Sequence, residues 1–186
     1  VLRRTLRPAQ GNIEFEELVL KPRELAKIQR LILVACGTSW HAALVGEYVI
    51  ETLARMPVEV EYGSEMRYRG RPIEKNTLVV SISQSGETAD TQAALSHAKG
   101  LGHTHTLAIC NVPESALVRL CKLRLLTRAG PEIGVASTKA FTTQLAALFL
   151  LALVLAKQRG RLSKQQEQQY LHELRHLPSA AQKVLE

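Results

Sequence analysis

The sequence is poor in aromatic and cysteine residues, and both shortages exclude classes of function. Aromatic side chains make up only 4% of the 186 residues, which leaves little surface on which nucleic-acid bases could stack. The three cysteines, Cys36, Cys110 and Cys121, are an odd number without C-x-x-C spacing, so neither a disulfide framework nor a zinc site is expected. This cysteine usage fits a reducing, cytoplasmic setting best.

No apolar run is long enough to predict a membrane span. The longest, residues 145–156, falls short of the roughly 18 residues that a transmembrane helix needs, so we expect a buried helix there. The first residues lack the features of a signal or transit peptide. Because the chain starts with Val1 rather than Met, we expect it to be part of a longer protein.

Several cofactor and catalytic motifs are also absent. The sequence has no G-x-G-x-x-G followed by an acidic residue and no G-x-x-x-x-G-K-[ST], and Ser85 is not in G-x-S-x-G, because residue 83 is Ser. His103 and His105 lack a third metal ligand nearby, which favours an ordinary loop. We therefore expect no cofactor, no nucleoside triphosphate and no metal ion.

Composition indicates one globular domain with a basic exterior. Apolar residues make up 46% of the chain and charged residues 22%, which is ordinary for a single domain of this length. The formal charge of +7 suits an anionic ligand, a nucleic acid or an acidic membrane surface. Since the basic residues are scattered, we predict no nucleic-acid and no membrane partner.

Short apolar runs alternate with helical patterns, which predicts an α/β fold. Runs of this kind are typical of strands covered on both faces in a parallel sheet, and we predict strands at residues 31–36, 58–62, 78–82, 106–110 and 123–127. Residues 58–62 alternate with acidic residues, which places that strand nearer an edge. Helices are predicted at residues 24–30, 40–55, 64–69, 88–99, 115–120, 137–157 and 163–176, with another turn from Pro178. The expected fold is a three-layer, doubly wound, five-stranded parallel sheet with the flavodoxin-like order 2-1-3-4-5.

Three helix ends carry capping signals. Gly100 is predicted to end the 88–99 helix in the left-handed conformation, and Gly160 is predicted to cap the 137–157 helix. Ser163 and Gln166 have the spacing of a capping box.

Two hydroxyl-rich turns follow the first and third predicted strands. They read Gly-Thr-Ser at residues 37–39 and Ser-Gln-Ser-Gly-Glu-Thr at residues 83–88. In a doubly wound sheet, ligands bind beyond the carboxyl ends of the strands where the strand order reverses, which for this order lies between strands one and three. We therefore expect the two turns to converge on one pocket.

The chemistry of these turns suits a phosphate dianion. Helix N-termini offer free backbone N–H groups, and the hydroxyls of Ser83, Ser85 and Thr88 add donors. Gly86 would let the backbone approach a ligand closely. The alternative is that these residues are ordinary helix N-caps.

Other residues are also expected near the pocket. Residues 130–139 contain two glycines and could either close over a sugar or form a plain capped connection. His41, after a predicted Ser39 cap, is expected near the pocket mouth or in a structural role. Cys36, at the end of a buried strand, is expected to pack rather than react.

Four motifs together resemble a known family. They are Ala-Cys-Gly-Thr-Ser at 35–39, Ser-Gln-Ser-Gly-Glu-Thr-Ala-Asp-Thr at 83–91, Ala-Ile-Cys-Asn-Val at 108–112 and Glu-Ile-Gly-Val-Ala-Ser-Thr-Lys-Ala-Phe-Thr-Thr-Gln at 132–144. The chain resembles a sugar isomerase (SIS) domain. It is most similar to the first of two SIS domains in the glutamine:fructose-6-phosphate aminotransferase family, which also carries the name glucosamine-6-phosphate synthase.

The resemblance implies a substrate-binding role for eight residues. Those that would hold the phosphate are Ser39, Ser83, Gln84, Ser85 and Thr88. Those that would contact the sugar are Thr38, Val135 and Ser137. Trp40 stands where the family often has Tyr, which affects the expected pocket rim. No catalytic residue is expected within this chain.

The resemblance also implies a reaction and partners. The family makes glucosamine 6-phosphate from fructose 6-phosphate and glutamine, with a glutaminase domain and a second SIS domain that this chain lacks. We expect this chain to bind the phosphosugar weakly, to catalyse no turnover alone and to form a homodimer. The expected division is an N-terminal segment with a short helix (1–30), the SIS domain (31–160), and C-terminal helices leading towards a second SIS domain (161–186).

Two alternatives remain open. One is the phosphosugar-sensing SIS module of a transcription regulator, although residues 1–30 do not resemble the helix-turn-helix domain that precedes such modules. The other is a purely dimerising module that uses the apolar helix at residues 145–156.

Overall fold

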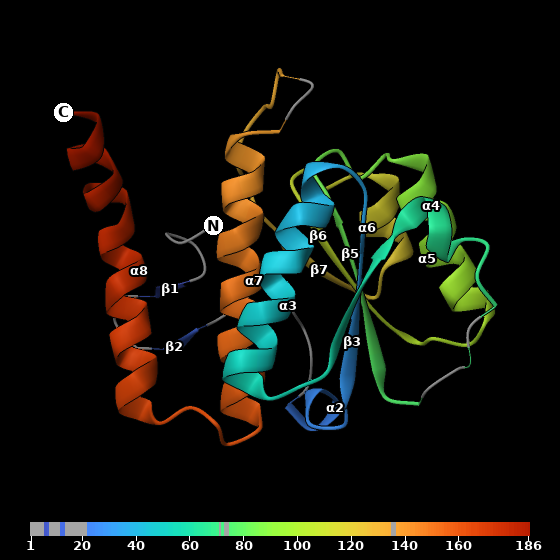
Figure 1. Cartoon of the computed structure of the whole chain (residues 1–186), viewed down its shortest axis with the longest axis horizontal. Coiled ribbons are helices and arrows are strands. Elements are labelled where there is room, and N and C mark those ends of the chain that lie inside the picture. Colours follow the sequence, from blue (N-terminus) through green and yellow to red (C-terminus); the bar gives the residue numbers. More distant parts are fainter. Residues whose placement is uncertain (1–5, 8–11, 14–21, 71, 73–74, 135–136) are drawn as a thin grey trace.

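The chain folds around a five-stranded parallel sheet with helices on both faces (Figure 1). The computed structural model describes residues 6–7, 12–13, 22–70, 72, 75–134 and 137–186. The strands of the sheet are β3 (Arg30–Ala35), β4 (Val58–Tyr62), β5 (Thr77–Ser83), β6 (His105–Cys110) and β7 (Leu123–Leu126). Their spatial order is β4-β3-β5-β6-β7, and each neighbouring pair is parallel. This is the flavodoxin-like order, with β4 at an edge, so the predicted fold class is confirmed.

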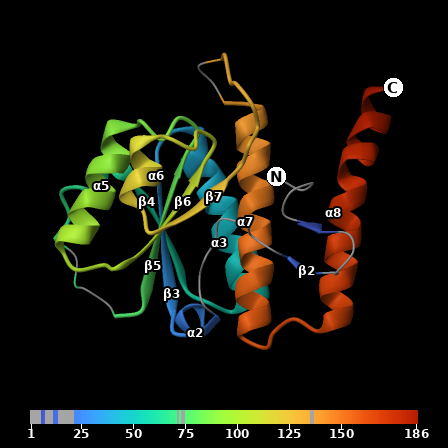
Figure 2. The same ribbon diagram turned by 180° about the vertical axis from the view of Figure 1, so that it is seen from behind.

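Helices α3 and α7 cover one face of the sheet, and α5 and α6 cover the other (Figures 1 and 2). The helices are α2 (Pro22–Leu25), α3 (Thr38–Ala54), α4 (Gly63–Met66), α5 (Ala89–Gly100), α6 (Ala116–Leu120), α7 (Lys139–Gln158) and α8 (Lys164–Leu185). Two short strands, β1 (Leu6–Arg7) and β2 (Asn12–Ile13), pair antiparallel as a separate sheet that the sequence did not predict.

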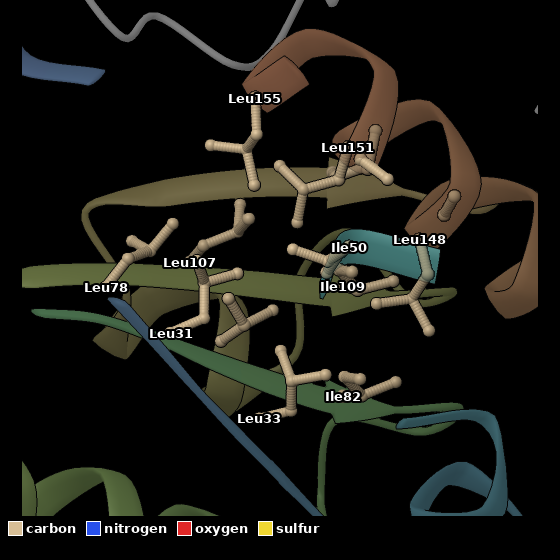
Figure 3. Close-up of a cluster of buried hydrophobic side chains, with 14 of the residues drawn as sticks. Leu31, Leu33, Ile50, Leu78, Ile82, Leu107, Ile109, Leu148, Leu151 and Leu155 are labelled. Carbon is tan, nitrogen blue, oxygen red and sulfur yellow. The ribbon is translucent and has the colours of Figure 1, made fainter. Parts of the chain in front are cut away.

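The strands bury both of their faces, because successive side chains point to opposite sides of the sheet. In β3, Leu31 and Leu33 join the apolar cluster beneath α3 and α7, whereas Ile32 and Val34 join the cluster beneath α5 and α6. Figure 3 shows the first cluster, in which α3 contributes Ile50 and α7 contributes Leu148, Leu151 and Leu155. Burial on both faces explains why the strands read as continuous apolar runs.

Helix α7 is a core helix between the sheet layer and α8. It is long and apolar enough to cross a membrane by length and composition, yet 56% of its most apolar stretch is buried within the protein. Its Leu150 and Leu153 pack on Leu171 and Leu174 of α8. The buried helix predicted for residues 145–156 is therefore confirmed.

The capping signals between α7 and α8 are confirmed. Gly160 has a φ of 65°, and the bond from its N–H to Lys157 O, together with one from Arg161 N to Ala156 O, ends α7 as a Schellman motif. The Ser163 hydroxyl accepts from Gln166 N at 3.2 Å, and Gln166 Oε1 accepts from Ser163 N at 3.0 Å, which completes the capping box.

Four other predicted helix boundaries are wrong. The helix predicted at 64–69 ends at Met66. The helix predicted at 24–30 ends at Leu25, because the chain turns to enter β3 and Gln29 N donates to Asn76 O. Gly100 is the last residue of α5, and the left-handed conformation falls on Gly102. Pro178 lies inside α8 rather than starting a new turn.

Candidate functional site

A cavity of about 430 Å³ lies at the carboxyl ends of β3 and β5, where the strand order reverses. Its volume falls within the range of about 300–1,000 Å³ typical of small-molecule sites. The residues that line it are Cys36, Gly37, Thr38, Ser39, Ile82, Ser83, Gln84, Ser85, Thr88, Glu132, Gly134 and Ser137. Seven of the eight candidate residues thus share one cavity, and the eighth, Val135, lies outside the described residues.

The first turn places the start of α3 against the cavity. Gly37 is the N-cap residue with a φ of 58°, a positive value that glycine adopts without strain. Ser39 lies inside the first helical turn, so the expectation that Ser39 is the cap is wrong. No side chain caps α3, and the N–H groups of a first turn have no acceptor within the helix. Trp40 N donates to Gly37 O at 3.0 Å, which leaves the N–H groups of Thr38 and Ser39 for a ligand.

The second turn is held by its own serines. Ser83 Oγ accepts from Gly86 N at 3.0 Å, and Ser85 Oγ accepts from Glu87 N at 3.1 Å. The hydroxyls of Ser83 and Thr88 are 3.3 Å apart. Thr88 is the N-cap residue of α5, but its side chain makes no capping bond. The alternative that these residues are ordinary N-caps requires a hydrogen bond from the cap side chain to the first turn, and neither α3 nor α5 has one.

The position of Gly86 has no room for a side chain, because the turn packs against Ser115 and Cys110. Its φ is 69°, and a Cβ atom there would lie 2.1 Å from Ser115 Oγ and 2.8 Å from Cys110 Sγ. The sequence suggested that Gly86 would admit a ligand. In the structure, the close approach is to Ser115 and Cys110, so the glycine positions the turn rather than lining the cavity.

Glu132 forms a wall of the cavity that the candidate residues did not include. Its carboxylate accepts from Ala140 N at 2.9 Å, from Thr138 Oγ1 at 3.2 Å and from Ser137 Oγ at 3.4 Å. The bond from the Ala140 N–H, followed by the bond from Thr138, lowers the pKa of Glu132 below its ordinary value. The sequence contains no signal for this role, because six residues separate Glu132 from the first turn of α7, where the macrodipole favours acidic residues.

The motif at 108–112 supports this wall from behind. Asn111 Oδ1 accepts from Ala129 N at 2.6 Å, and Asn111 Nδ2 donates to Gly130 O at 2.8 Å. Asn111 therefore holds the connection that leads to Glu132.

Three residues near the turns have structural contacts. Trp40 stacks on Tyr62, with ring centroids 4.5 Å apart, and meets His41 edge-on at 5.1 Å. Neither Trp40 nor His41 lines the cavity. Cys36 does line it, and its sulfur accepts from Thr91 Oγ1 at 3.6 Å.

The cavity offers hydrogen-bond donors without a cationic side chain. The lining residues that the structure describes include no lysine or arginine. Two helix N-termini, each carrying a partial positive charge, face this space instead. Within the described ranges, no three His, Cys, Asp or Glu side chains gather as a metal site would require.

Fold and site together define a doubly wound α/β domain with a pocket rich in hydroxyl groups at its switch point. A model of the SIS domain family matches residues 24–154, and the chain belongs to this family.

Relatives of known name agree with this placement. The chain is 61% identical over 159 residues to the glutamine--fructose-6-phosphate aminotransferase [isomerizing] of Bordetella parapertussis, covering 86% of this chain and 26% of the relative. It is 56% identical over 158 residues to the protein of that name from Neisseria meningitidis serogroup B, covering 85% and 26%. The chain thus spans about a quarter of the length of these relatives.

A solved structure of a protein with a related name has a similar fold. The C-terminal domain of glucosamine-fructose-6-phosphate aminotransferase from Francisella tularensis superposes with a TM-score of 0.90 at 42% sequence identity. The match covers 96% of this chain and 50% of that one.

Proposed function

We propose that this chain is the fructose-6-phosphate-binding SIS domain of a glutamine:fructose-6-phosphate aminotransferase. The parent enzyme would make glucosamine 6-phosphate from fructose 6-phosphate and glutamine. Identities of up to 61% to relatives with that name support the proposal, as does the cavity at the switch point. The same names favour this function over the sensing module of a transcription regulator.

In this proposal the phosphate lies between the N-termini of α3 and α5. Ser39, Ser83, Gln84, Ser85 and Thr88 hold it. Hydrogen bonds to a charged group are worth about 1.5–3 kcal/mol each, whereas association costs at least about 4 kcal/mol. Four or five such bonds would therefore give micromolar to millimolar affinity without a cationic side chain.

The sugar lies on the side of the cavity formed by the segment before α7. Thr38, Val135 and Ser137 contact it in this proposal. Thr38 and Ser137 line the same cavity as the phosphate-binding residues, which supports the assignment.

The remaining parts of the proposal concern the parent protein. A glutaminase domain and a second SIS domain would be its other parts, the assembly would be a homodimer, and its setting would be the cytoplasm. Glucosamine 6-phosphate, the product, would occupy the same cavity as the substrate.

The convergence of the two turns on one cavity carries the proposal, and Ser85 tests it. We expect Ser85→Ala to weaken fructose 6-phosphate binding about tenfold, or about 1.4 kcal/mol, in isothermal titration calorimetry. Ser96→Ala, on the exposed face of α5, is the matched control and should keep the affinity of the unaltered chain. Equal affinities of the Ser85 variant and the unaltered chain would contradict the assignment.

A further inference from the structure

A buried glutamine connects the cavity to the packing between α3 and α7. Gln144 of α7 is 1% exposed, and its Nε2 donates to Ser39 Oγ at 3.0 Å. The two residues are 105 positions apart in the sequence. Among the described residues, Gln144 Oε1 is buried without a hydrogen-bond partner. The side chain lies behind Ser39 and does not itself line the cavity.

Stability alone does not account for a glutamine at this position. Helices α3 and α7 contribute to one apolar cluster, which includes Ala43, Ala147 and Leu148. A buried amide whose oxygen lacks a partner costs free energy, and an apolar side chain of similar volume would avoid this cost. The amide therefore needs an explanation beyond packing.

The serines of the cavity share one pattern of hydrogen bonding. The hydroxyl oxygens of Ser83 and Ser85 accept from backbone N–H groups, and that of Ser39 accepts from Gln144. A hydroxyl that accepts still has its own proton to donate. The protons of Ser39 and Ser85 are thus available to an anion in the cavity, and the Ser83 proton can go either to the anion or to Thr88 Oγ1, 3.3 Å away. The donor to Ser39 is a side chain, which a mutation can remove, whereas the donors to Ser83 and Ser85 are backbone groups.

We propose that Gln144 is a positioning residue that holds the Ser39 hydroxyl so that its proton points to the phosphate. This inference rests on the proposed phosphate site. The hydrogen bonds run in one direction, from Gln144 Nε2–H to Ser39 Oγ and from Ser39 Oγ–H to a phosphate oxygen. Each bond polarises the next, which strengthens the donor that meets the dianion.

The direction of this chain of bonds can be reversed by substitution. A carboxylate can only accept, so Gln144→Glu would draw the Ser39 proton away from the cavity and add a negative charge behind it. Gln144→Met keeps an unbranched side chain of similar volume but removes the donor. The two variants therefore separate loss of the bond from its reversal.

The test measures fructose 6-phosphate binding by calorimetry, with fructose as the ligand without phosphate. We expect Gln144→Met to weaken binding about threefold to tenfold, and Gln144→Glu to weaken it further. In a Ser39→Ala background, Gln144→Met should have no additional effect, because its target is gone. Thr143→Val is the matched control, since the Thr143 hydroxyl donates to Ala140 O of its own helix. Thermal unfolding of Gln144→Met should occur at the temperature of the unaltered chain or above.

The outcomes separate the inference from the proposed function. If Ser39→Ala weakens binding but Gln144→Met and Gln144→Glu match the unaltered chain, the positioning role is wrong and the phosphate site stands. If the effects of Ser39→Ala and Gln144→Met add, Gln144 acts through general packing and the inference is also wrong. If fructose binds as well as fructose 6-phosphate and Ser39→Ala changes nothing, the proposed function itself fails.

Discussion

The hydroxyl groups around the cavity are oriented by the N–H groups that donate hydrogen bonds to them. Ser83 and Ser85 are fixed by the backbone of their own turn, and Ser39 by Gln144. The sequence could predict the turn serines, since spacing within one short segment determines their contacts. It could not predict Gln144 as a partner of Ser39, because that contact depends on how α7 packs on α3.

Gly86 gives a prediction at this scale. We expect Gly86→Ala to lower the free energy of unfolding by about 2–4 kcal/mol, because alanine is strained at positive φ and its Cβ would overlap Ser115. Urea denaturation measures the change. The control is Gly100→Ala at the end of α5, where a Cβ meets nothing within 4 Å and stability should be unchanged or slightly higher. Equal stability of Gly86→Ala and the unaltered chain would show that the turn can shift without cost.

The elements show which parts of the fold the sequence determines. The strands were predicted within one or two residues at each end, because burial on both faces leaves an uninterrupted apolar run. Helix ends were predicted less well, as Gly100 and Pro178 show. A glycine or proline signals a preference, but the end of a helix depends on which backbone groups find partners in the rest of the fold.

At the N-terminus of α7, the carboxylate of Glu132 takes the place of a cap. The Thr138 side chain makes no capping bond, whereas Glu132 accepts from Ala140 N. The site prediction omitted Glu132, because it lies before the helix and is separated from α7 by the six residues 133–138. Residues of the 130–139 segment cap α7 and line the cavity, so the capped connection is present, and closure over a sugar stays a prediction.

This cap should make stability depend on pH. The folded-state pKa of Glu132 is lowered, so its contribution is present above the ordinary pKa of 4.5 and is lost as pH falls through the folded-state value. Glu132→Gln should therefore lower the melting temperature near neutral pH, with a difference that shrinks as the pH falls below 4.5. Thermal unfolding across this range checks the prediction. Glu173→Gln, on the exposed face of α8, serves as the charge-matched control. A difference that is constant with pH would mean that the charge of Glu132 plays no part.

At the scale of the whole molecule, topology brings the cavity together. The two turns are more than 40 residues apart, and only the order β4-β3-β5 makes them neighbours. The alternation of strands and helices predicts a doubly wound sheet, and ligands bind such a sheet where the strand order reverses, which is why the sequence could place the cavity. The net charge of +7 acts at longer range, since it raises the local concentration of anions before the N–H and hydroxyl donors bind them.

The last prediction concerns what this chain does by itself. Conversion of fructose 6-phosphate to glucosamine 6-phosphate needs ammonia from glutamine and groups that move protons on the sugar. The family resemblance assigns both to other domains, and the chain spans about a quarter of its named relatives. We therefore expect glutamine and fructose 6-phosphate to yield no glucosamine 6-phosphate with this chain, even while calorimetry shows fructose 6-phosphate bound. A full-length relative, assayed in parallel, would confirm that the assay detects product. Sustained turnover that disappears with Ser85→Ala would show that the chain alone contains the catalytic groups.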